Sequence, residues 1–302
     1  MMLNIIKNRK IWLSVSGILI ALSITALSLW GLNFGIDFTG GSLLETKFTN
    51  YQPSISEIEG SLAGTGVTNL VIQPTADGTT LLRFKESSQE VHQAINKNLS
   101  ELAEKNNGTA KEMRFDSIGP SIGQELKSKS FNAIFIVLLM MIAFIAYAFR
   151  KVSKPVASWK YGLAAIIALS HDVLIVLGVF AALGHFAGTE INTAFIAAIL
   201  TVLGYSVNDT IIVFDRTREN LPKSSQNFED TINLSVNQVL TRSINTSFSV
   251  ILALLAVLIF GGESIRDFAL VLAIGVFVGT YSSIFIASPL VVIWEKLTKK
   301  KA

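Results

Sequence analysis

Four ionisable side chains lie within, or at the start of, strongly hydrophobic stretches of this chain. His171 and Asp172 lie in one stretch, Asp209 lies in the next, and Arg242 opens a third. An ionisable side chain inside a bilayer is energetically costly, so it is usually paired and often marks an ion pathway or a proton relay. These residues therefore point to proton-linked chemistry inside a membrane.

A basic partner would control the protonation of Asp209. An arginine that reaches the carboxylate would keep it ionised, whereas burial alone would keep it protonated. A movement that makes and breaks the contact between Asp209 and Arg242 would therefore couple proton passage to motion. We predict that these two residues form the relay. The candidate supporting polar residues are Asn208, Thr210, Asn245, Asp172 and His171.

Each of these residues also has a purely structural interpretation. Asp209 could form a structural salt bridge, and Arg242 could be an interfacial cation that extends its side chain toward the lipid headgroups. His171 and Asp172 could equally provide hydrogen bonds that pack helices together. The charged residues just after the Asp209 stretch are interpreted as a cytoplasmic salt-bridge cluster. They are Asp215, Arg216, Arg218 and Glu219.

The composition indicates that the hydrophobic stretches cross a bilayer. Half of the residues are hydrophobic and 16% are charged, whereas soluble domains carry about 25% charged residues. The first stretch is longer than the apolar region of a signal peptide, so we interpret it as an uncleaved anchor. In the last stretch, Gly275 and Gly279 have the spacing that lets membrane helices approach closely. Six segments are long enough to span, at about 11–32, 131–149, 163–184, 192–214, 243–260 and 267–294.

Basic residues are concentrated in alternate loops of the chain. The positive-inside rule places these loops and both termini in the cytoplasm, and residues 33–130 outside. At 1.5 Å per residue, Asp172 and Asp209 then lie roughly 13 Å and roughly 7 Å from the cytoplasmic ends of their helices. The basic residues that set this orientation are Lys7, Arg9, Lys10, Arg150, Lys151, Lys154, Lys160, Arg216, Arg218, Lys223, Lys296, Lys299, Lys300 and Lys301.

The segment 33–130 is too polar to span a membrane and too long for a structureless loop. The order of its predicted elements is strand, helix, strand, strand, helix, strand, which is that of the ferredoxin-like fold. Its patterns predict strands at 42–49, 67–73, 79–84 and 110–116, helices at 53–64 and 88–104, and a turn at Asp77 and Gly78.

The predicted fold class is therefore membrane α-helical, with six transmembrane helices and one extracytoplasmic α+β ferredoxin-like domain. We expect three parts. Residues 1–32 form the cytoplasmic N-terminus and the first transmembrane helix, and residues 33–130 form the extracytoplasmic domain. Residues 131–302 form a five-helix transmembrane domain with a cytoplasmic C-terminus.

The composition disfavours several other classes of function. The chain has no cysteine, and its three histidines have unrelated spacings, so we expect no metal centre and no cofactor. The net charge of +3 does not suggest a nucleic-acid partner. The segment 33–130 shows no serine–histidine–aspartate set and no phosphate-binding glycine loop. We predict that the protein is not an enzyme.

Three motifs give the chain a family resemblance. They occupy residues 34–41 (FGIDFTGG), 119–126 (GPSIGQEL) and 204–220 (GYSVNDTIIVFDRTREN). Together with the six-span layout, they closely resemble the SecD/SecF family of bacterial protein-export membrane proteins, which is similar to the resistance–nodulation–division transporters. The chain length and the single modest outside domain resemble the SecF branch of this family rather than SecD.

The resemblance implies a function, a set of partners and a location. A SecF-type protein pairs with SecD, associates with the SecYEG channel and often with YajC and YidC, and contacts lipid and the translocating preprotein. It uses the proton-motive force to assist translocation after the ATP-driven SecA step. It is a multi-pass protein of the bacterial inner membrane with cytoplasmic termini. The family's relay aspartate matches Asp209 and its membrane arginine matches Arg242, while a further family carboxylate lies in SecD.

Two other functions compete with protein export. A small-molecule or lipid exporter of the same transporter group would need a large substrate pocket in its outside domains, which one compact domain does not favour. An intramembrane aspartyl protease could use Asp172 and Asp209 as two carboxylates that share a proton. The sequence lacks the Gly-x-Gly-Asp element that such proteases resemble, and Arg242 would disfavour a shared proton.

Overall fold

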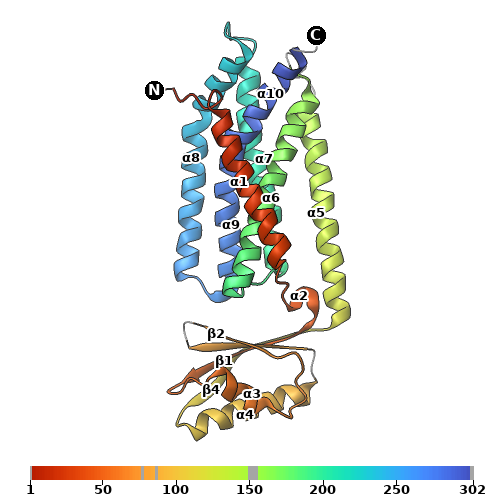
Figure 1. The fold of residues 1–302 in the computed structure, drawn as a ribbon, viewed down its shortest axis with the longest axis vertical. Helices are drawn as coiled ribbons and strands as arrows, with labels where there is room; N and C mark the ends of the chain where they lie inside the picture. The colour runs from red at the N-terminus through yellow and green to blue at the C-terminus, as the bar shows by residue number, and fades with distance from the viewer. Residues whose placement is uncertain (1, 76–77, 86–87, 149–155, 300–302) are drawn as a thin grey trace. The chain divides into compact units, whose positions relative to one another are not determined.

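The computed structural model describes residues 2–75, 78–85, 88–148 and 156–299. Contacts divide the chain into two compact units (Figure 1). The helical unit comprises Met1–Asn33 and Asn132–Ala302, and the sheet unit comprises Phe34–Phe131. Some residues used in the predictions above lie outside the described ranges. They are Asp77 of the predicted turn and Arg150, Lys151, Lys154, Lys300 and Lys301 of the predicted topology.

Six helical segments are long and apolar enough to cross a membrane, which confirms the predicted number of spans. The sixth span runs over Ile265–Thr298 and is not a single regular helix. It comprises α9, a π-helical segment η1 and α10. The elements are α1 (Arg9–Trp30), α5 (Pro120–Ala148), α6 (Ser158–Ala187), α7 (Thr193–Asn220), α8 (Phe228–Phe260), α9 (Glu263–Ser282), η1 (Ser283–Ala287) and α10 (Ser288–Lys299).

Two of these helices begin well before the spans predicted from hydropathy. α5 begins at Pro120 rather than near residue 131, and α8 begins at Phe228 rather than near residue 243. Asn227 caps α8, because its side chain accepts a hydrogen bond from the backbone N–H of Asp230. Hydropathy detects only the apolar part of a helix, so it does not reveal these polar first turns.

Close helix contacts in the helical unit depend on glycine. A Cβ atom on Gly178 of α6 would lie 2.3 Å from the Cβ of Ser23 on α1. A Cβ on Gly275 of α9 would lie 2.2 Å from a methyl group of Val202 on α7. The spacing of Gly275 and Gly279 therefore serves packing inside this chain. α6, α7 and the sixth span bury about half of their apolar length, whereas α5 and α8 are mostly exposed.

The sheet unit is an α+β domain with four strands in the order β2-β3-β1-β4, and all neighbouring strands are antiparallel. This order, with helices after β1 and β3, is the split βαβ arrangement of the ferredoxin-like fold and confirms the predicted fold class. The elements are α2 (Ile36–Thr39), β1 (Gly41–Thr49), α3 (Ile55–Leu62), β2 (Val71–Pro74), β3 (Thr79–Phe84), α4 (Gln89–Lys105) and β4 (Thr109–Ile118).

One face of the sheet and two helices enclose the apolar core of this unit. Alternate residues of β1 and β3 point inward, including the fully buried Leu44 and Leu82. They pack against Ile58 of α3 and against Ile95 and Leu99 of α4. The two helices predicted from the sequence, α3 and α4, thus pack their apolar sides against the sheet.

One strand prediction was partly wrong. β2 begins at Val71 rather than at residue 67. Asn69 has a φ of 55°, a left-handed conformation that a regular strand cannot contain. The residues before β2 therefore form an irregular segment with a bend at Asn69, although Val67 and Leu70 still pack against the core.

Two of the sequence motifs meet where the chain enters and leaves the sheet unit. Gly40 and Gly41 have φ values of 70° and 129°, which glycine adopts without strain. A Cβ on Gly40 would lie 2.9 Å from the Cα of Pro120, and a Cβ on Gly123 would lie 2.9 Å from the backbone nitrogen of Gly40. The glycines of both motifs therefore allow a direct backbone contact.

Candidate functional site

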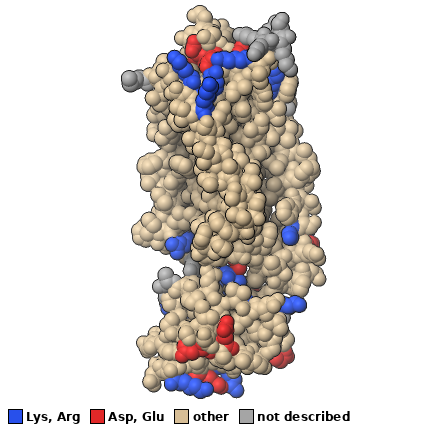
Figure 2. Space-filling view, viewed as in Figure 1, with Lys and Arg blue, Asp and Glu red and all other residues tan. Residues whose placement is uncertain are grey.

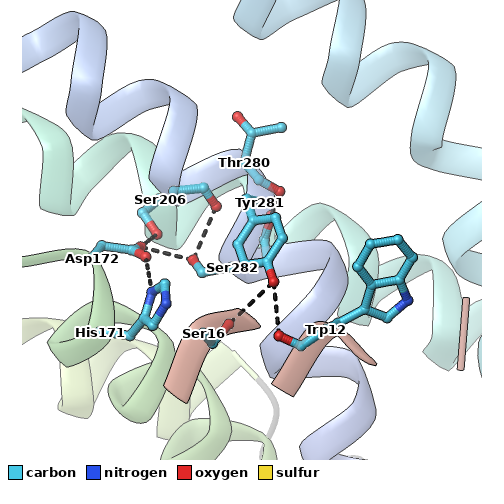
Figure 3. A network of polar contacts seen from close by, with 10 residues as sticks. Trp12, Ser16, His171, Asp172, Ser206, Thr280, Tyr281 and Ser282 are labelled. Carbon is cyan, nitrogen blue, oxygen red and sulfur yellow. Dashed lines mark hydrogen bonds and ion pairs between the residues drawn. The ribbon is translucent and has the colours of Figure 1, made fainter. Parts of the chain in front are cut away.

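Asp172 lies at the centre of a polar cluster inside the helical unit (Figure 3). It is fully buried, with an exposed fraction of 0%. One carboxylate oxygen, Oδ1, lies 3.0 Å from Nδ1 of His171. The other, Oδ2, accepts hydrogen bonds from Ser206 Oγ on α7 at 2.6 Å and from Ser282 Oγ on α9 at 2.8 Å. Three helices therefore contribute donors to one buried carboxylate.

The cluster continues toward α1 through the neighbours of His171. The ring of His171 stacks near that of Tyr281, with centroids 6.3 Å apart. The Tyr281 hydroxyl donates to the backbone carbonyl of Trp12 at 2.8 Å and lies 3.2 Å from Ser16 Oγ (Figure 3). Nε2 of His171 is buried and has no hydrogen-bond partner among the described residues. The imidazole is therefore held on one side only.

Asp209 is another buried carboxylate of the helical unit. Its exposed fraction is 5%. Ser243 Oγ on α8 donates to Oδ1 at 2.6 Å, and Ser283 Oγ at the start of η1 donates to Oδ2. Ser243 is itself followed one turn later by Ser247, whose hydroxyl donates to the Ser243 carbonyl at 2.7 Å. Hydroxyl groups, rather than a basic side chain, hold this carboxylate.

Arg242 lies beside Asp209 without forming an ion pair with it. Both residues line a hollow of about 90 Å³. Within the part of the chain that the structure describes, no nitrogen of Arg242 comes within 4.0 Å of the Asp209 carboxylate, and Arg242 is exposed. The contact that the sequence suggested is therefore open in this structure. The hollow is lined by Tyr205, Asn208, Asp209, Ile212, Arg242, Ser243 and Thr246.

The other predicted site residues fall into two groups. Asn208 lines the hollow with Asp209, and Thr210 is buried on the same helix. Asn245 is exposed on α8, where its backbone carbonyl accepts from Ser249 Oγ. His171 and Asp172 form the separate cluster on α6. The predicted residues therefore occupy two neighbouring sites that share helix α7 and the α9–η1 segment.

Four serines hold the two carboxylates, and no role was predicted for any of them. Serine is tolerated in membrane helices and carries no periodic signal. The adjacent pair Ser282 and Ser283 could have indicated this role. Two neighbouring hydroxyls in the middle of an apolar span are poorly accommodated by lipid and therefore suggest polar partners within the protein. The four serines are Ser206, Ser243, Ser282 and Ser283.

The close packing of α9 on α7 positions these serines. A Cβ on Gly279 would lie 2.9 Å from the Cβ of Ser206, so only glycine allows the two helices to approach at this level. Three residues later the chain passes from α9 to η1. Successive helical side chains diverge by about 100°, and Ser282 therefore faces Asp172 while Ser283 faces Asp209.

Charged side chains outside this core gather at the end of the helical unit that carries both termini (Figures 1 and 2). Glu229 at the start of α8 forms ion pairs with Arg9 and with Lys296. The predicted charge cluster after the Asp209 stretch also forms ion pairs. They join Arg216 to Glu219 and Arg218 to Asp215, each at 2.7 Å.

The fold and the site define a multi-span membrane protein that buries carboxylates among its helices, a class in which such residues mark ion pathways. The family description "Protein export membrane protein SecD/SecF, C-terminal" matches residues 98–297, and "SecD/SecF GG Motif" matches residues 31–50. The chain belongs to the SecD/SecF family, in its SecF branch.

Relatives of similar length carry the name protein translocase subunit SecF. The protein from Thermobaculum terrenum is 42% identical and aligns over 97% of this chain and 94% of its own. The protein from Anaerolinea thermophila is 38% identical, with the same shares aligned.

The chain is also similar to solved structures of SecDF. The crystal structure of SecDF from Thermus thermophilus, described as a translocon-associated membrane protein, aligns with a TM-score of 0.85 at 31% identity. A SecDF structure in a super-membrane-facing form aligns with a TM-score of 0.69 at 32% identity. The alignments cover 98% and 100% of this chain but 39% and 40% of the SecDF chains. This chain therefore spans about two fifths of the length of those proteins.

Proposed function

We propose that this chain is a SecF subunit that assists Sec-dependent translocation of proteins across the bacterial inner membrane. Its near full-length similarity to proteins named translocase subunit SecF supports this role. The similarity to two fifths of SecDF supports SecD as the partner that supplies the remaining part of the unit. SecYEG, YajC and YidC are proposed as further partners in the same pathway.

The energy source in this proposal is the proton-motive force, used after the ATP-driven SecA step. The observation that carries it is the setting of Asp209, a carboxylate held by two serines beside an arginine that lines the same hollow. In one state the hydroxyls hold Asp209, as in this structure. In the other state Arg242 pairs with the ionised carboxylate. A proton that binds Asp209 favours the first state, and its release favours the second.

The size of the hollow supports a proton rather than a larger substrate at this site. Its volume is about 90 Å³, whereas pockets for small organic ligands measure about 300–1,000 Å³. Further polar groups come from Asn208 and Thr210 on α7 and from the exposed Asn245 on α8. His171 and Asp172 are supporting residues in this proposal.

An exposed polar face on the spanning helices supports a membrane partner. Arg242 and Asn245 on α8 and Asn208 on α7 are exposed in the isolated chain. Polar side chains in a membrane span normally face protein or water rather than lipid. We propose that SecD covers this face. We propose that both termini lie in the cytoplasm. Arg9 and Lys296 both pair with Glu229, and this gathering of basic residues supports the proposal through the positive-inside rule.

The proposed coupling is tested with Asp209→Asn in membrane vesicles that contain SecD and the Sec channel. Translocation of a preprotein is measured after SecA action has been arrested, with and without a proton gradient. We expect the variant to lose the stimulation by the gradient, because an amide cannot exchange a proton. Asp215→Asn is the matched control, since Asp215 forms a surface ion pair with Arg218. Full stimulation in Asp209→Asn would refute the relay.

A further inference from the structure

Two adjacent serines at the junction of α9 and η1 hold two different buried carboxylates. Ser282 Oγ donates to Oδ2 of Asp172 on α6 at 2.8 Å. Ser283 Oγ donates to Oδ2 of Asp209 on α7. One peptide bond therefore separates the residues whose hydroxyls stabilise the two acids.

Each of these hydroxyls has a second acceptor within reach. Ser282 Oγ lies 3.1 Å from the backbone carbonyl oxygen of Gly279, and Ser283 Oγ lies 3.1 Å from that of Thr280. A serine hydroxyl has one hydrogen to donate and two lone pairs to accept with. Each hydroxyl can therefore point its hydrogen either at the carboxylate or at the carbonyl three residues earlier.

We propose that Ser282 and Ser283 couple Asp172 and Asp209 into one two-carboxylate unit, in which Asp172 is a proton-binding site of its own. When Asp172 is ionised, the Ser282 hydrogen points at Oδ2. When a proton binds Oδ2, the new O–H donates to Ser282 Oγ, and the Ser282 hydrogen turns to the Gly279 carbonyl. The same exchange joins Asp209, Ser283 and the Thr280 carbonyl. The only covalent bond that forms or breaks is the O–H bond of the carboxyl group.

The π-helical segment is what links the two exchanges. π-helical turns inside α-helices are short, mark functional sites, and leave carbonyls that side chains can reach. η1 begins at Ser283, and Ser288 Oγ lies 3.2 Å from the Ser283 carbonyl oxygen. When a serine hydroxyl turns from the carboxylate to a backbone carbonyl of its own helix, the geometry where α9 meets η1 changes. The neighbouring serine then moves as well. Protonation of one carboxylate therefore alters the donor offered to the other.

Among the described residues, titratable or charged side chains around the pair come from α6, α7, α8 and α9. α6 contributes His171, which holds Oδ1 of Asp172, and α8 contributes Arg242, which lines the hollow beside Asp209. α9 contributes Tyr281, whose hydroxyl is bound to the Trp12 carbonyl of α1. α7 contributes Tyr205, whose hydroxyl lies 2.9 Å from Ser247 Oγ. Among these groups, Arg242 alone is a permanent charge, and it lies on the Asp209 side.

Infrared titration of the full chain in lipid bilayers tests the coupling. A protonated carboxyl has a C=O stretching band that the ionised form lacks, and Asp172→Asn and Asp209→Asn assign the two bands. We expect Asp209→Asn to move the pH midpoint of the Asp172 band by about one pH unit, the size at which two sites titrate as a pair. We expect Ser282→Ala to abolish most of that shift, and Ser282→Thr, which keeps a hydroxyl, to restore it.

Ser249→Ala is the matched control, because Ser249 is exposed and its hydroxyl donates to backbone carbonyls of its own helix. It should leave both bands unchanged. A midpoint of the Asp172 band that is unmoved by Asp209→Asn would overturn the proposal, as would an Asp172 that never binds a proton over the stable pH range. If a variant with asparagine at 172 fails to fold, the wild-type Asp172 band is read in Asp209→Asn and in Ser282→Ala instead.

This inference rests on the proposed function, but its failure can be recognised separately. If the carboxyl bands are uncoupled while Asp209→Asn still abolishes gradient-stimulated translocation, only the serine link is wrong. If the bands are coupled while Asp209→Asn translocates normally, the relay function is wrong and the two-carboxylate unit remains.

Discussion

The helical unit and the sheet unit differ in which side chains they bury and which they expose. The sheet unit encloses apolar side chains such as Leu82, and most of its charged residues are at least partly exposed. The helical unit exposes apolar side chains along α5 and α8, and it buries Asp172, Asp209 and the serines that bind them. The difference follows from the solvent, because lipid accepts leucine but cannot hydrogen-bond a carboxylate. Buried polar groups in the helical unit are therefore the candidates for its function, whereas in the sheet unit buried apolar groups account for its stability.

Two leucine-to-alanine changes should show the largest difference between the two units. Leu82→Ala removes a fully buried core side chain of the sheet unit, and we expect a loss of about 2–5 kcal/mol of its stability. Leu139→Ala removes a half-exposed side chain of α5 and should cost less than about 0.5 kcal/mol. Hydrogen exchange of amides in β1 and β3, and thermal melting of the whole chain, measure the two effects. Equal losses would show that the two apolar surfaces are not in different solvents.

Glycine packing in the helical unit gives the next largest effect. Gly275→Ala places a methyl group against Val202, and we expect overpacking to cost about 1–3 kcal/mol. Gly204→Ala is the matched control, because a Cβ atom at Gly204 would meet no neighbouring side chain or helix within 4 Å. The thermal midpoint of the purified chain in lipid distinguishes the two. If both variants have the same thermal midpoint, the stability of the helical unit does not depend on the close approach of α9 to α7.

Helix capping in the sheet unit should have a smaller effect. The Ser54 side chain accepts from the Glu57 backbone N–H, and the Glu57 side chain accepts from the Ser54 backbone N–H. We expect Ser54→Ala to destabilise α3 by about 1 kcal/mol. Ser56→Ala, at an exposed position of the same helix, is the control. Hydrogen exchange limited to α3 is the measurement, and unchanged protection in Ser54→Ala would show that the cap contributes nothing.

The smallest expected effect is a pH dependence of the same cap. Hydrogen bonds from Ser54 and Tyr51 lower the pKa of Glu57 from 4.5 to about 2. Because the folded pKa lies below the unfolded value, this contribution is complete above about pH 4.5 and is lost as the pH falls toward 2. Amide exchange in α3 should therefore accelerate over that window in the wild type. Glu57→Gln should show no such change there, and an identical acid profile would contradict the assignment.

Much of the fold could be predicted from the sequence, because burial in lipid and folding in water each leave a recognisable pattern of apolar residues. Apolar length located the six spans, and alternation and turn residues located the strand and helix order of the sheet unit. The errors fall where a polar or conformational feature interrupts the pattern. The first turns of α8 lie beyond the apolar run, and the positive φ of Asn69 delays the start of β2.

The candidate site was predictable in its ionisable members and in Asn208, which lines the hollow beside Asp209. Asp172 and Asp209 stand out because a carboxylate in an apolar run is rare. The expected contact between Asp209 and Arg242 depends on side-chain conformation, and in this structure the hydroxyls of Ser243 and Ser283 take its place. The relay role of these residues stays a prediction. The serines that bind the carboxylates could not be predicted, because the choice depends on how α7, α8 and the sixth span pack together.

The backbone contact between Gly40 and Pro120 has a consequence for how the sheet unit is attached. Within this unit, glycine at positions 40 and 123 lets the segment just before β1 touch the start of α5. A module whose ends adjoin can be cut out or exchanged with a short splice. These two touching segments should therefore accept a foreign domain of similar end spacing, while a side chain introduced at Gly40 would force the two segments apart.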